Sequence, residues 1–267
     1  MQEIRITDIK DHRVEIYTRL NDKQVKRYNE PGIGYFICES EKVIRRALQA
    51  GYPAESFFVE ENKYQLVSEW DGVGRDVPCF VSDVTLMRQI TGYALTGGIL
   101  AVMRRKPLLQ EEEILSKSRY VVLLDDIENP TNVGAIFRSA AALGADAILL
   151  TEGCADPLYR RAARVSMGSV FVLDWTFSSA SVIKKIKDGG FCLTALALSD
   201  HARELGRDVS PFREKTVLAL GNEEYGVSDT ILEACDHIVK IPMKKGVDSL
   251  NVAAAGAVAF WAFFNNQ

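Results

Sequence analysis

Short apolar runs recur through the second half of the chain, and helical patterns separate most of them. The runs lack polar alternation, as expected for strands that are buried on both faces of a sheet. They occupy residues 120–127, 147–151, 171–175, 191–197, 216–220 and 237–241. The helical patterns occupy residues 133–143, 158–166, 179–187, 229–235 and 250–265. Strands that alternate with helices predict an α/β fold with a parallel sheet and right-handed crossovers.

The first part of the chain shows a less regular alternation of the same two patterns. Helical spacing marks residues 22–27, 41–50, 63–70 and 83–90, with Ser82 as a candidate cap for the last of these. Strand-like runs mark residues 34–38, 56–59, 79–81 and 97–103. The sequence therefore predicts a small α/β domain over residues 1–106. A polar, acidic stretch over 107–119, typical of a linker or an exposed helix, separates it from a second domain over 120–267.

Composition narrows the class of protein without identifying its function. With 267 residues, 47% of them hydrophobic and 25% charged, the chain has the composition of a globular protein and a length that suits one large domain or two ordinary ones. The five cysteines are scattered and form no C-x-x-C pair, which argues against a zinc site and a disulfide framework and favours the cytoplasm. No secretory signal is expected. The longest apolar stretch, Val252–Phe264, is too short to span a bilayer and predicts a buried helix.

The charge pattern leaves the binding partner undecided. A net charge of −4 argues against nucleic acid, because proteins that bind duplexes usually carry a basic excess. Several local basic clusters nevertheless exist: Arg104-Arg105-Lys106, Arg160-Arg161 with Arg164, Lys184-Lys185 with Lys187, and Lys244-Lys245. A solvated surface face explains any one of these clusters more simply than a binding site does.

The first of three unusual loops, residues 128–134, follows the strand predicted at 120–127. Ligands bind beyond the carboxyl ends of the strands in open parallel sheets, so this loop is a candidate site. Asn132 is suited to helix entry, where its side chain can accept a backbone N–H. Arg138 lies off the apolar stripe of the helix, in a region where the helix dipole prefers an anion. It is either a surface arginine paired with an acidic neighbour or a guanidinium directed at a phosphate.

Two further loops follow the strands predicted at 216–220 and 237–241. Gly221 and Gly226 bracket the second loop, so its backbone can approach a ligand closely, although a plain turn explains it equally well. In the third loop Ser249 is placed to cap the last helix, and Asn251 has poor helix propensity. The fingerprints G-x-G-x-x-G, G-x-x-x-x-G-K-[ST] and G-x-S-x-G are absent from these loops, which argues against dehydrogenases, P-loop enzymes and α/β-hydrolases.

Taken in order, the three loops resemble the three motifs of the SpoU/TrmH family of knotted RNA methyltransferases. Residues 129–139 look like motif one, residues 221–226 like motif two, and residues 241–243 with 249–252 like motif three. The likeness covers the chain from about residue 120 to its end.

Residues 35–48 resemble, more weakly, the L30e-like RNA substrate-binding domain that precedes the catalytic domain in many members of this family. Where many members have Gly after the Glu, this chain has Ser40. This part of the resemblance implies that residues 1–106 bind the RNA substrate.

The resemblance implies a SPOUT fold with a C-terminal trefoil knot, which general topology rules would not predict. It also implies a homodimer whose active sites are bordered by both subunits, S-adenosylmethionine as cofactor, and no metal. By motif position, the implied cofactor-binding residues are Gly221, Ile241 and Leu250. The implied catalytic residues are Asn132, Arg138, Glu223, Ser249 and Asn251.

The implied reaction is methyl transfer from a sulfonium to a ribose 2′-hydroxyl, which requires alignment and removal of the hydroxyl proton. Arg138 has been viewed in this family as the activating group, but a guanidinium is essentially always protonated. We therefore favour Arg138 as a phosphate anchor that lowers the pKa of the hydroxyl, and leave the base open. Glu223 either orients motif three or accepts the proton, while Ser249 and Asn251 shape the loop around the ligands.

The extra N-terminal domain favours ribosomal RNA over transfer RNA as the substrate. Three alternatives stay open at this point: a transfer-RNA 2′-O-methyltransferase, a methyltransferase for a base nitrogen, and a catalytically silent RNA-binding protein with the same fold. The intact set of motif residues argues against the silent protein.

Overall fold

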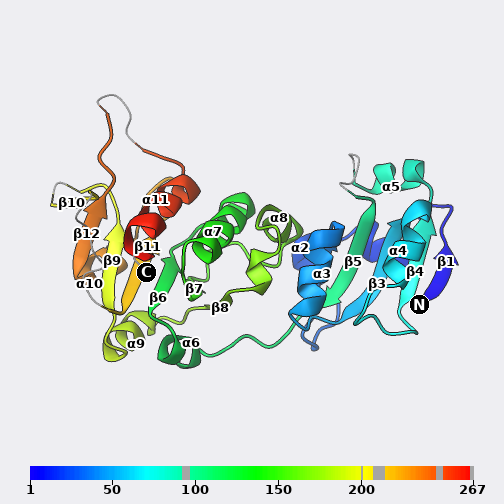
Figure 1. Ribbon diagram of the computed structural model, residues 1–267, viewed down its shortest axis with the longest axis horizontal. Helices are drawn as coiled ribbons and strands as arrows, with labels where there is room; N and C mark the ends of the chain where they lie inside the picture. The colour runs from blue at the N-terminus through cyan, green and yellow to red at the C-terminus, as the bar shows by residue number, and fades with distance from the viewer. Residues whose placement is uncertain (92–96, 200, 207–213, 245–248, 265–267) are drawn as a thin grey trace. The chain divides into compact units, whose positions relative to one another are not determined.

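The chain folds into two compact units in a computed structural model that describes residues 1–91, 97–199, 201–206, 214–244 and 249–264 (Figure 1). Unit 1 comprises Met1–Pro107 together with Leu158–Phe171, and unit 2 comprises Leu108–Pro157 together with Val172–Gln267. The structure thus places Leu158–Phe171, which lies within the predicted second domain, with unit 1. That residues 1–106 and 120–267 are separate functional domains stays a prediction.

Unit 1 contains a five-stranded mixed sheet with the strand order β1-β4-β3-β5-β2 (Figure 1). Its strands are β1 (Gln2–Arg5), β2 (Tyr35–Glu39), β3 (Ala54–Glu60), β4 (Pro78–Ser82) and β5 (Ile99–Arg104). Its α-helices are α1 (Glu15–Thr18), α2 (Asp22–Arg27), α3 (Glu41–Gln49), α4 (Tyr64–Ser68), α5 (Val84–Thr91) and α8 (Arg160–Val165). Strand β5 runs antiparallel to both of its neighbours, and the other pairings are parallel. The predicted small α/β unit is confirmed.

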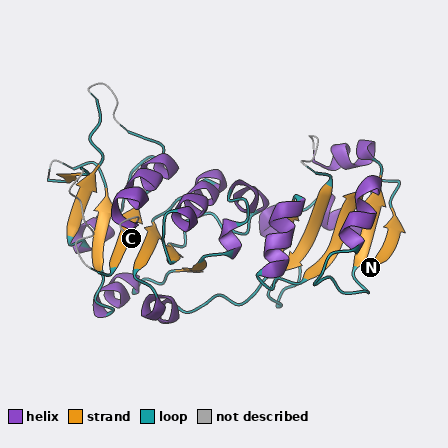
Figure 2. Cartoon of the chain, viewed as in Figure 1, coloured by secondary structure: helices purple, strands orange, loops and turns teal. Residues whose placement is uncertain are grey.

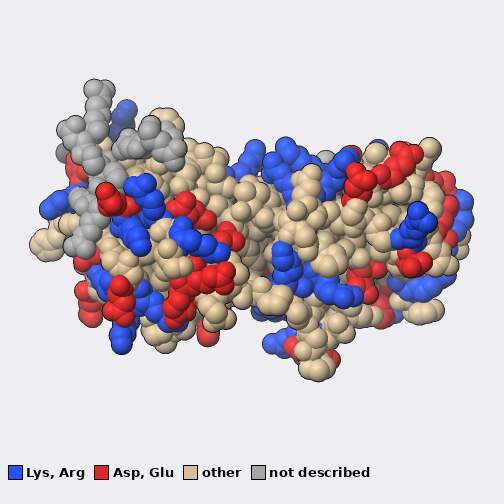
Figure 3. Space-filling model, turned by 60° about the horizontal axis from the view of Figure 1, so that its bottom comes forward, with Lys and Arg blue, Asp and Glu red and all other residues tan. Residues whose placement is uncertain are grey.

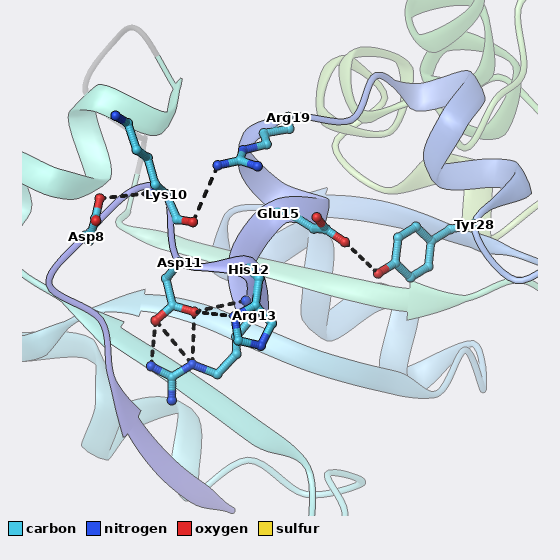
Figure 4. A network of polar contacts seen from close by, with 8 residues as sticks. All are labelled: Asp8, Lys10, Asp11, His12, Arg13, Glu15, Arg19 and Tyr28. Atoms are coloured by element: carbon cyan, nitrogen blue, oxygen red, sulfur yellow. Dashed lines mark hydrogen bonds and ion pairs between the residues drawn. The ribbon is translucent and has the colours of Figure 1, made fainter.

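The N-terminal segment with β1 and α1 was not predicted, because polar residues interrupt its apolar pattern. Local polar contacts hold it instead, as Figure 4 shows. Asp11 accepts hydrogen bonds from the backbone N–H of Arg13 at 2.9 Å and from its guanidinium at 2.6 Å. These bonds lower the pKa of Asp11 to about 2. The Tyr28 hydroxyl donates to Glu15 of α1 at 3.2 Å, which joins α1 to the end of α2.

The cap predicted for α5 is wrong by one residue. Leu86 donates its backbone N–H to the Asp83 carboxylate at 2.8 Å, so Asp83 and not Ser82 caps the helix. The Ser82 hydroxyl instead donates to the backbone carbonyl of Asp83 at 3.2 Å. Both residue types are good caps, and the residue where the helix begins decides between them.

Unit 2 contains a seven-stranded sheet with the order β10-β12-β9-β11-β6-β7-β8 (Figure 1). Figure 2 shows its strands in orange and its helices in purple. Its strands are β6 (Tyr120–Leu124), β7 (Ala147–Leu150), β8 (Asp174–Phe177), β9 (Cys192–Leu196), β10 (Arg203–Glu204), β11 (Thr216–Leu220) and β12 (His237–Lys240). Its helices are α6 (Glu111–Lys117), α7 (Pro130–Ala142), α9 (Val182–Asp188), α10 (Asp229–Ala234) and α11 (Val252–Phe264). All neighbouring strands pair in parallel, which confirms the predicted fold class. The trefoil knot stays a prediction.

Two predictions about apolar segments of the second half need correction. The strand predicted at 171–175 begins instead at Asp174, because Phe171 ends a 3-10 helix and packs its ring against Phe36 and Tyr52 of unit 1. The last helix is not buried all round. Its exposed face carries Val258 at 44% and Trp261 at 63% exposure, while the opposite face packs on α7. Asn265, the predicted end of this helix, lies outside the described residues.

Candidate functional site

The three loops singled out in the sequence extend from one edge of the parallel sheet. Strands β6 and β11 are direct neighbours in register, with Leu124 paired to Leu220 at their carboxyl ends. Strand β12 lies on the far side of β9, which pairs with β11. Chain order reverses between β6 and β11, and such a switch point is the usual place for a ligand in an open α/β sheet.

Helix α7 begins earlier than predicted, which changes the position of Asn132. Asn129 is the N-cap, and its side chain accepts the backbone N–H of Thr131 at 2.8 Å. Pro130 occupies the first helical turn, where its missing N–H has no cost. Asn132 is therefore not the cap. It is buried within the first turn, and its amide is free to bond to other loops.

A chain of polar side chains joins the three loops. The Asn132 Nδ2 donates to the Glu223 carboxylate, and the Asn132 Oδ1 accepts from the Nδ2 of Asn251 at 3.1 Å. The Asn251 Oδ1 in turn accepts the backbone N–H groups of Ala253 at 3.0 Å and Ala254 at 3.4 Å. Each amide is bonded at both ends, so its orientation is fixed. The structure thus brings three of the five predicted catalytic residues into one network.

The cap predicted for α11 is corrected by the same contacts. Asn251, and not Ser249, accepts the free N–H groups of the first turn, because α11 begins at Val252. Ser249 is exposed and lines the cavity described below. The poor helix propensity of Asn251 fits this position, since Asn favours the N-cap over the helix interior.

The loop over residues 221–226 folds tightly on itself. Asn222 and Gly226 exchange two backbone hydrogen bonds of 3.0 Å each, and the Asn222 side chain donates to the carbonyl of Asp126 at 2.7 Å. A Cβ atom on Gly221 would lie far inside van der Waals contact with the backbone of Gly226 and Val227. Gly226 itself has a φ of +77°. The backbone conformation of the loop therefore requires glycine at both positions, before any contact with a ligand is considered.

A cavity of about 450 Å³ opens at this loop. The three predicted cofactor-binding residues, Gly221, Ile241 and Leu250, all line it. Sequence analysis missed a wall of this cavity that the last residue of β9 and the two residues after it form: Leu196, Ala197 and Leu198. The side chains of these residues carry no polar group, so their chemistry gave no signal of a site. Only their position at the carboxyl end of a parallel strand could have indicated it. A volume of this size, with apolar walls and a few polar groups, suits a small organic ligand.

Arg138 stands apart from the hydrogen-bonded network. Its side chain is exposed on α7, away from the buried Phe137 and Ala140. Within the part of the chain that the structure describes, no acidic residue pairs with it. The sequence-based alternative of a surface arginine paired with an acidic neighbour is therefore not what the structure shows, and the guanidinium is available to an anion.

Two titratable groups near the site, the Tyr225 phenol and the Cys154 thiol, stay neutral at neutral pH. Desolvation raises the pKa of the Tyr225 phenol, and the nearby carboxylates of Asp126, Glu128 and Asp125 raise it further. Burial raises the pKa of the Cys154 thiol to about 11, so this thiol is not a nucleophile at neutral pH. Among the described residues, no group of His, Cys, Asp or Glu could hold a metal ion. The hydrogen-bonded network and the cavity beside it can position ligands and polarise them.

Most basic clusters noted in the sequence have structural partners. Lys185 contacts the carboxylates of Glu111 and Glu112, the latter at 2.8 Å. Lys187 pairs with Asp236 at 2.8 Å. In unit 1, Arg104 pairs with Glu55 at 2.7 Å, Lys106 lies over the ring of Tyr52, and Arg160 and Arg164 contact Glu39. Lys244 is exposed, and Lys245 lies outside the described residues. The buried Glu111 also shows that the predicted linker forms part of unit 2.

Known proteins resemble this chain along nearly its whole length. Residues 119–261 match the model of the SpoU rRNA Methylase family. The chain is 32% identical over 260 residues to an uncharacterized tRNA/rRNA methyltransferase of Mycobacterium bovis, covering 96% of this chain and 90% of that protein. It is 26% identical over 257 residues to the 23S rRNA (guanosine(2553)-2'-O)-methyltransferase of Bacillus subtilis, covering 95% and 96%. An AdoMet-bound rRNA methyltransferase from Sinorhizobium meliloti shares the fold, with a TM-score of 0.84 at 22% identity over 98% of this chain and 97% of that one.

Proposed function

Because the chain belongs to the SpoU rRNA methylase family, we propose that it transfers a methyl group from S-adenosylmethionine to a ribose 2′-hydroxyl of structured RNA, with ribosomal RNA as the favoured substrate. The observation that carries the proposal is the polar chain from Asn251 through Asn132 to Glu223, which joins the three motif loops at one sheet edge. The 2′-O position and the ribosomal target are supported by the similarity to the Bacillus subtilis enzyme.

The cavity beside Gly221 fits S-adenosylmethionine, which is the ligand named for the Sinorhizobium meliloti structure. Its lining combines backbone from residues 221–226 with the apolar side chains of Ile241 and Leu250. Tight backbone can present N–H and C=O groups to polar atoms of the cofactor, while the apolar walls cover its adenine. We propose Gly221, Ile241 and Leu250 as cofactor-binding residues on this basis.

The cofactor supplies an electrophilic methyl group on a positively charged sulfur, so the protein must align the acceptor hydroxyl and assist loss of its proton. We assign Arg138 to an RNA phosphate, because it is exposed and no acidic partner neutralises it among the described residues. Its permanent positive charge then favours the ionised hydroxyl. Glu223 is assigned an orienting role, since its carboxylate already accepts the Asn132 amide. Ser249 and Asn251 shape the third loop, and no side chain is assigned as the base.

Incubation of the full chain with total RNA and labelled S-adenosylmethionine tests the proposal. We expect label in one nucleotide of ribosomal RNA whose phosphodiester resists alkaline cleavage, because a 2′-O-methyl group blocks attack by that hydroxyl. A labelled nucleotide without this resistance would identify a base methyltransferase. Label in transfer RNA would change the substrate, and RNA binding without any labelling or cofactor binding would indicate a silent protein.

A homodimer is the second part of the proposal. Along α11, Ala254, Val258 and Trp261 form an exposed stripe at positions spaced four and three residues apart, and Asn251 of the polar network continues it. An exposed apolar stripe on a helix is typical of an interface between subunits. A two-fold dimer would bury this stripe against its copy.

Trp261→Glu is expected to convert the dimer to a monomer and to reduce methylation. A buried charge opposite its own copy destabilises a two-fold interface by several kcal/mol. The dissociation constant of the dimer should therefore rise by at least about 100-fold. Analytical ultracentrifugation measures the change. Val172→Glu is the matched control, because Val172 is exposed to 66% on unit 2 and lies outside α11. A Trp261→Glu protein that remains dimeric would refute this interface.

RNA binding by residues 1–106, the likeness of this region to an L30e domain, and a cytoplasmic location stay predictions. Within the described residues, no helix is long and apolar enough to cross a membrane.

A further inference from the structure

Helices α3 and α8 of unit 1 carry a group of basic side chains on neighbouring elements. In α3, Lys42, Arg45 and Gln49 are exposed and lie three to four residues apart, and Glu41, whose side chain is 44% exposed, begins the helix. Figure 3 shows that Lys and Arg side chains gather in groups on the face of the molecule that it draws. The α3/α8 surface is defined by Lys42, Arg45, Arg46, Arg160, Arg161 and Arg164.

Arg46 of α3 contacts the turn that directly follows α8. The Arg46 guanidinium donates to the backbone carbonyl of Met167, just beyond the end of α8, at 2.7 Å. Gly168 follows so closely that a Cβ there would lie 3.0 Å from the Cδ of Arg46. These contacts place the middle of α3 beside the turn that follows α8 within unit 1.

A buried carboxylate holds α8 in place but does not neutralise all of the positive charge of its arginines. The Glu39 side chain is fully buried at the end of β2, where it accepts from Arg160 Nε at 3.0 Å and from Arg164 Nη1 at 3.1 Å. A buried carboxylate needs such partners, so the two arginines have a structural role. Two cations nevertheless face one anion. Arg160 Nη2 is buried and has no hydrogen-bond partner among the described residues.

The remaining cations of the α3/α8 surface have little compensation. Lys42 and Arg161 are exposed and form no ion pair with any described residue. Arg45 pairs with Glu41 at 3.3 Å and lies over the ring of Trp70. Asp22 accepts the backbone N–H of Arg160 at 3.2 Å and also counts against this charge. With Glu39, Glu41 and Asp22 counted, the six cations leave a surplus of three positive charges in a chain whose net charge is −4. Positive charge is therefore concentrated on this surface. A face that only contacts solvent does not require such a concentration.

We propose that the α3/α8 surface binds the phosphate backbone of the substrate RNA. The inference rests on the proposed function, because it takes RNA as the substrate. Guanidinium groups match the geometry of phosphate oxygens, and a surplus of arginine over lysine favours phosphate recognition. Since α8 lies in the chain between β7 and β8, this RNA-binding surface extends beyond residues 1–106, to which the sequence confined the RNA-binding domain.

The double variant Lys42→Ala with Arg161→Ala tests the inference in the full-length protein. Both side chains are exposed and unpaired among the described residues, so the fold should persist, which the thermal midpoint checks. With protein-free ribosomal RNA as the probe, we expect the KM for RNA to rise by about tenfold or more near 0.15 M salt, because two phosphate contacts are lost. The kcat at saturating RNA and the affinity for S-adenosylmethionine should stay unchanged. The slope of log affinity against log salt should fall by about two.

The variant Lys23→Ala with Lys184→Ala is the matched control, because it removes the same charge from exposed positions of α2 and α9. A rise in KM equal to that of the control would overturn the inference, as would an unchanged salt slope. If wild-type protein methylates RNA and the test variant does so with the same KM, only the α3/α8 surface is refuted. If wild-type protein neither binds nor methylates RNA, the proposed function and this inference fail together.

Discussion

Arg138→Ala is expected to lower the rate of methyl transfer by about 100- to 1,000-fold and to leave the affinity for S-adenosylmethionine within about threefold of wild type. Removing one preorganised group that stabilises charge in the transition state commonly costs 10²–10³ in rate. The side chain is exposed and unpaired among the described residues, so its loss should not disturb the fold. It does not line the cavity beside Gly221, so cofactor binding should survive.

Two companion variants distinguish a phosphate anchor from other roles. Arg119→Ala is the matched control, because Arg119 is exposed at the amino end of β6, the sheet edge opposite the three loops. Arg138→Lys keeps the positive charge but loses the planar fork, so it should retain part of the activity. Calorimetry with the cofactor and single-turnover methylation give the two readouts. Loss of cofactor binding in Arg138→Ala, or near wild-type rates, would contradict the assignment.

The sequence predicted the order of elements in unit 2 because buried parallel strands have a strong apolar signature. It also placed the three loops at one sheet edge, since parallel strands share the direction of their carboxyl ends. It misplaced the caps at Asn132 and Ser249. Which of several polar residues caps a helix depends on the first helical residue, and sequence patterns locate that residue only to within a few positions. Asn129 and Asn251 take these roles in the structure.

Contacts over long sequence separations were beyond prediction for a different reason. Glu39 and Arg160 lie 121 residues apart in the chain, and no local pattern indicates that a buried carboxylate of β2 requires α8. The same holds for Phe171, whose apolar side chain suggested a strand but packs on Phe36, a residue of the same unit that is distant in the chain. The cavity wall at Leu198 was missed because an apolar residue at a strand end does not signal a ligand.

Gly221→Ala is expected to weaken binding of S-adenosylmethionine by about 100-fold or more and to abolish measurable methylation. The added methyl group would collide with the backbone of Gly226 and Val227, which unlike a flexible side chain has no rotamer to escape into. Overpacking of this kind costs roughly 1–3 kcal/mol of stability. The two 3.0 Å hydrogen bonds between Asn222 and Gly226 would have to lengthen or break.

The consequence reaches the polar network because residues 221–226 carry Glu223. If the loop opens, Glu223 leaves the Asn132 amide, and the cavity loses one wall at the same time. Calorimetric titration with the cofactor and the thermal midpoint measure the two effects. Gly206→Ala is the matched control, because a Cβ at Gly206 would meet no atom within 4 Å. Wild-type cofactor affinity in Gly221→Ala, with a midpoint equal to that of the control, would show that the cofactor does not depend on the closed form of this loop.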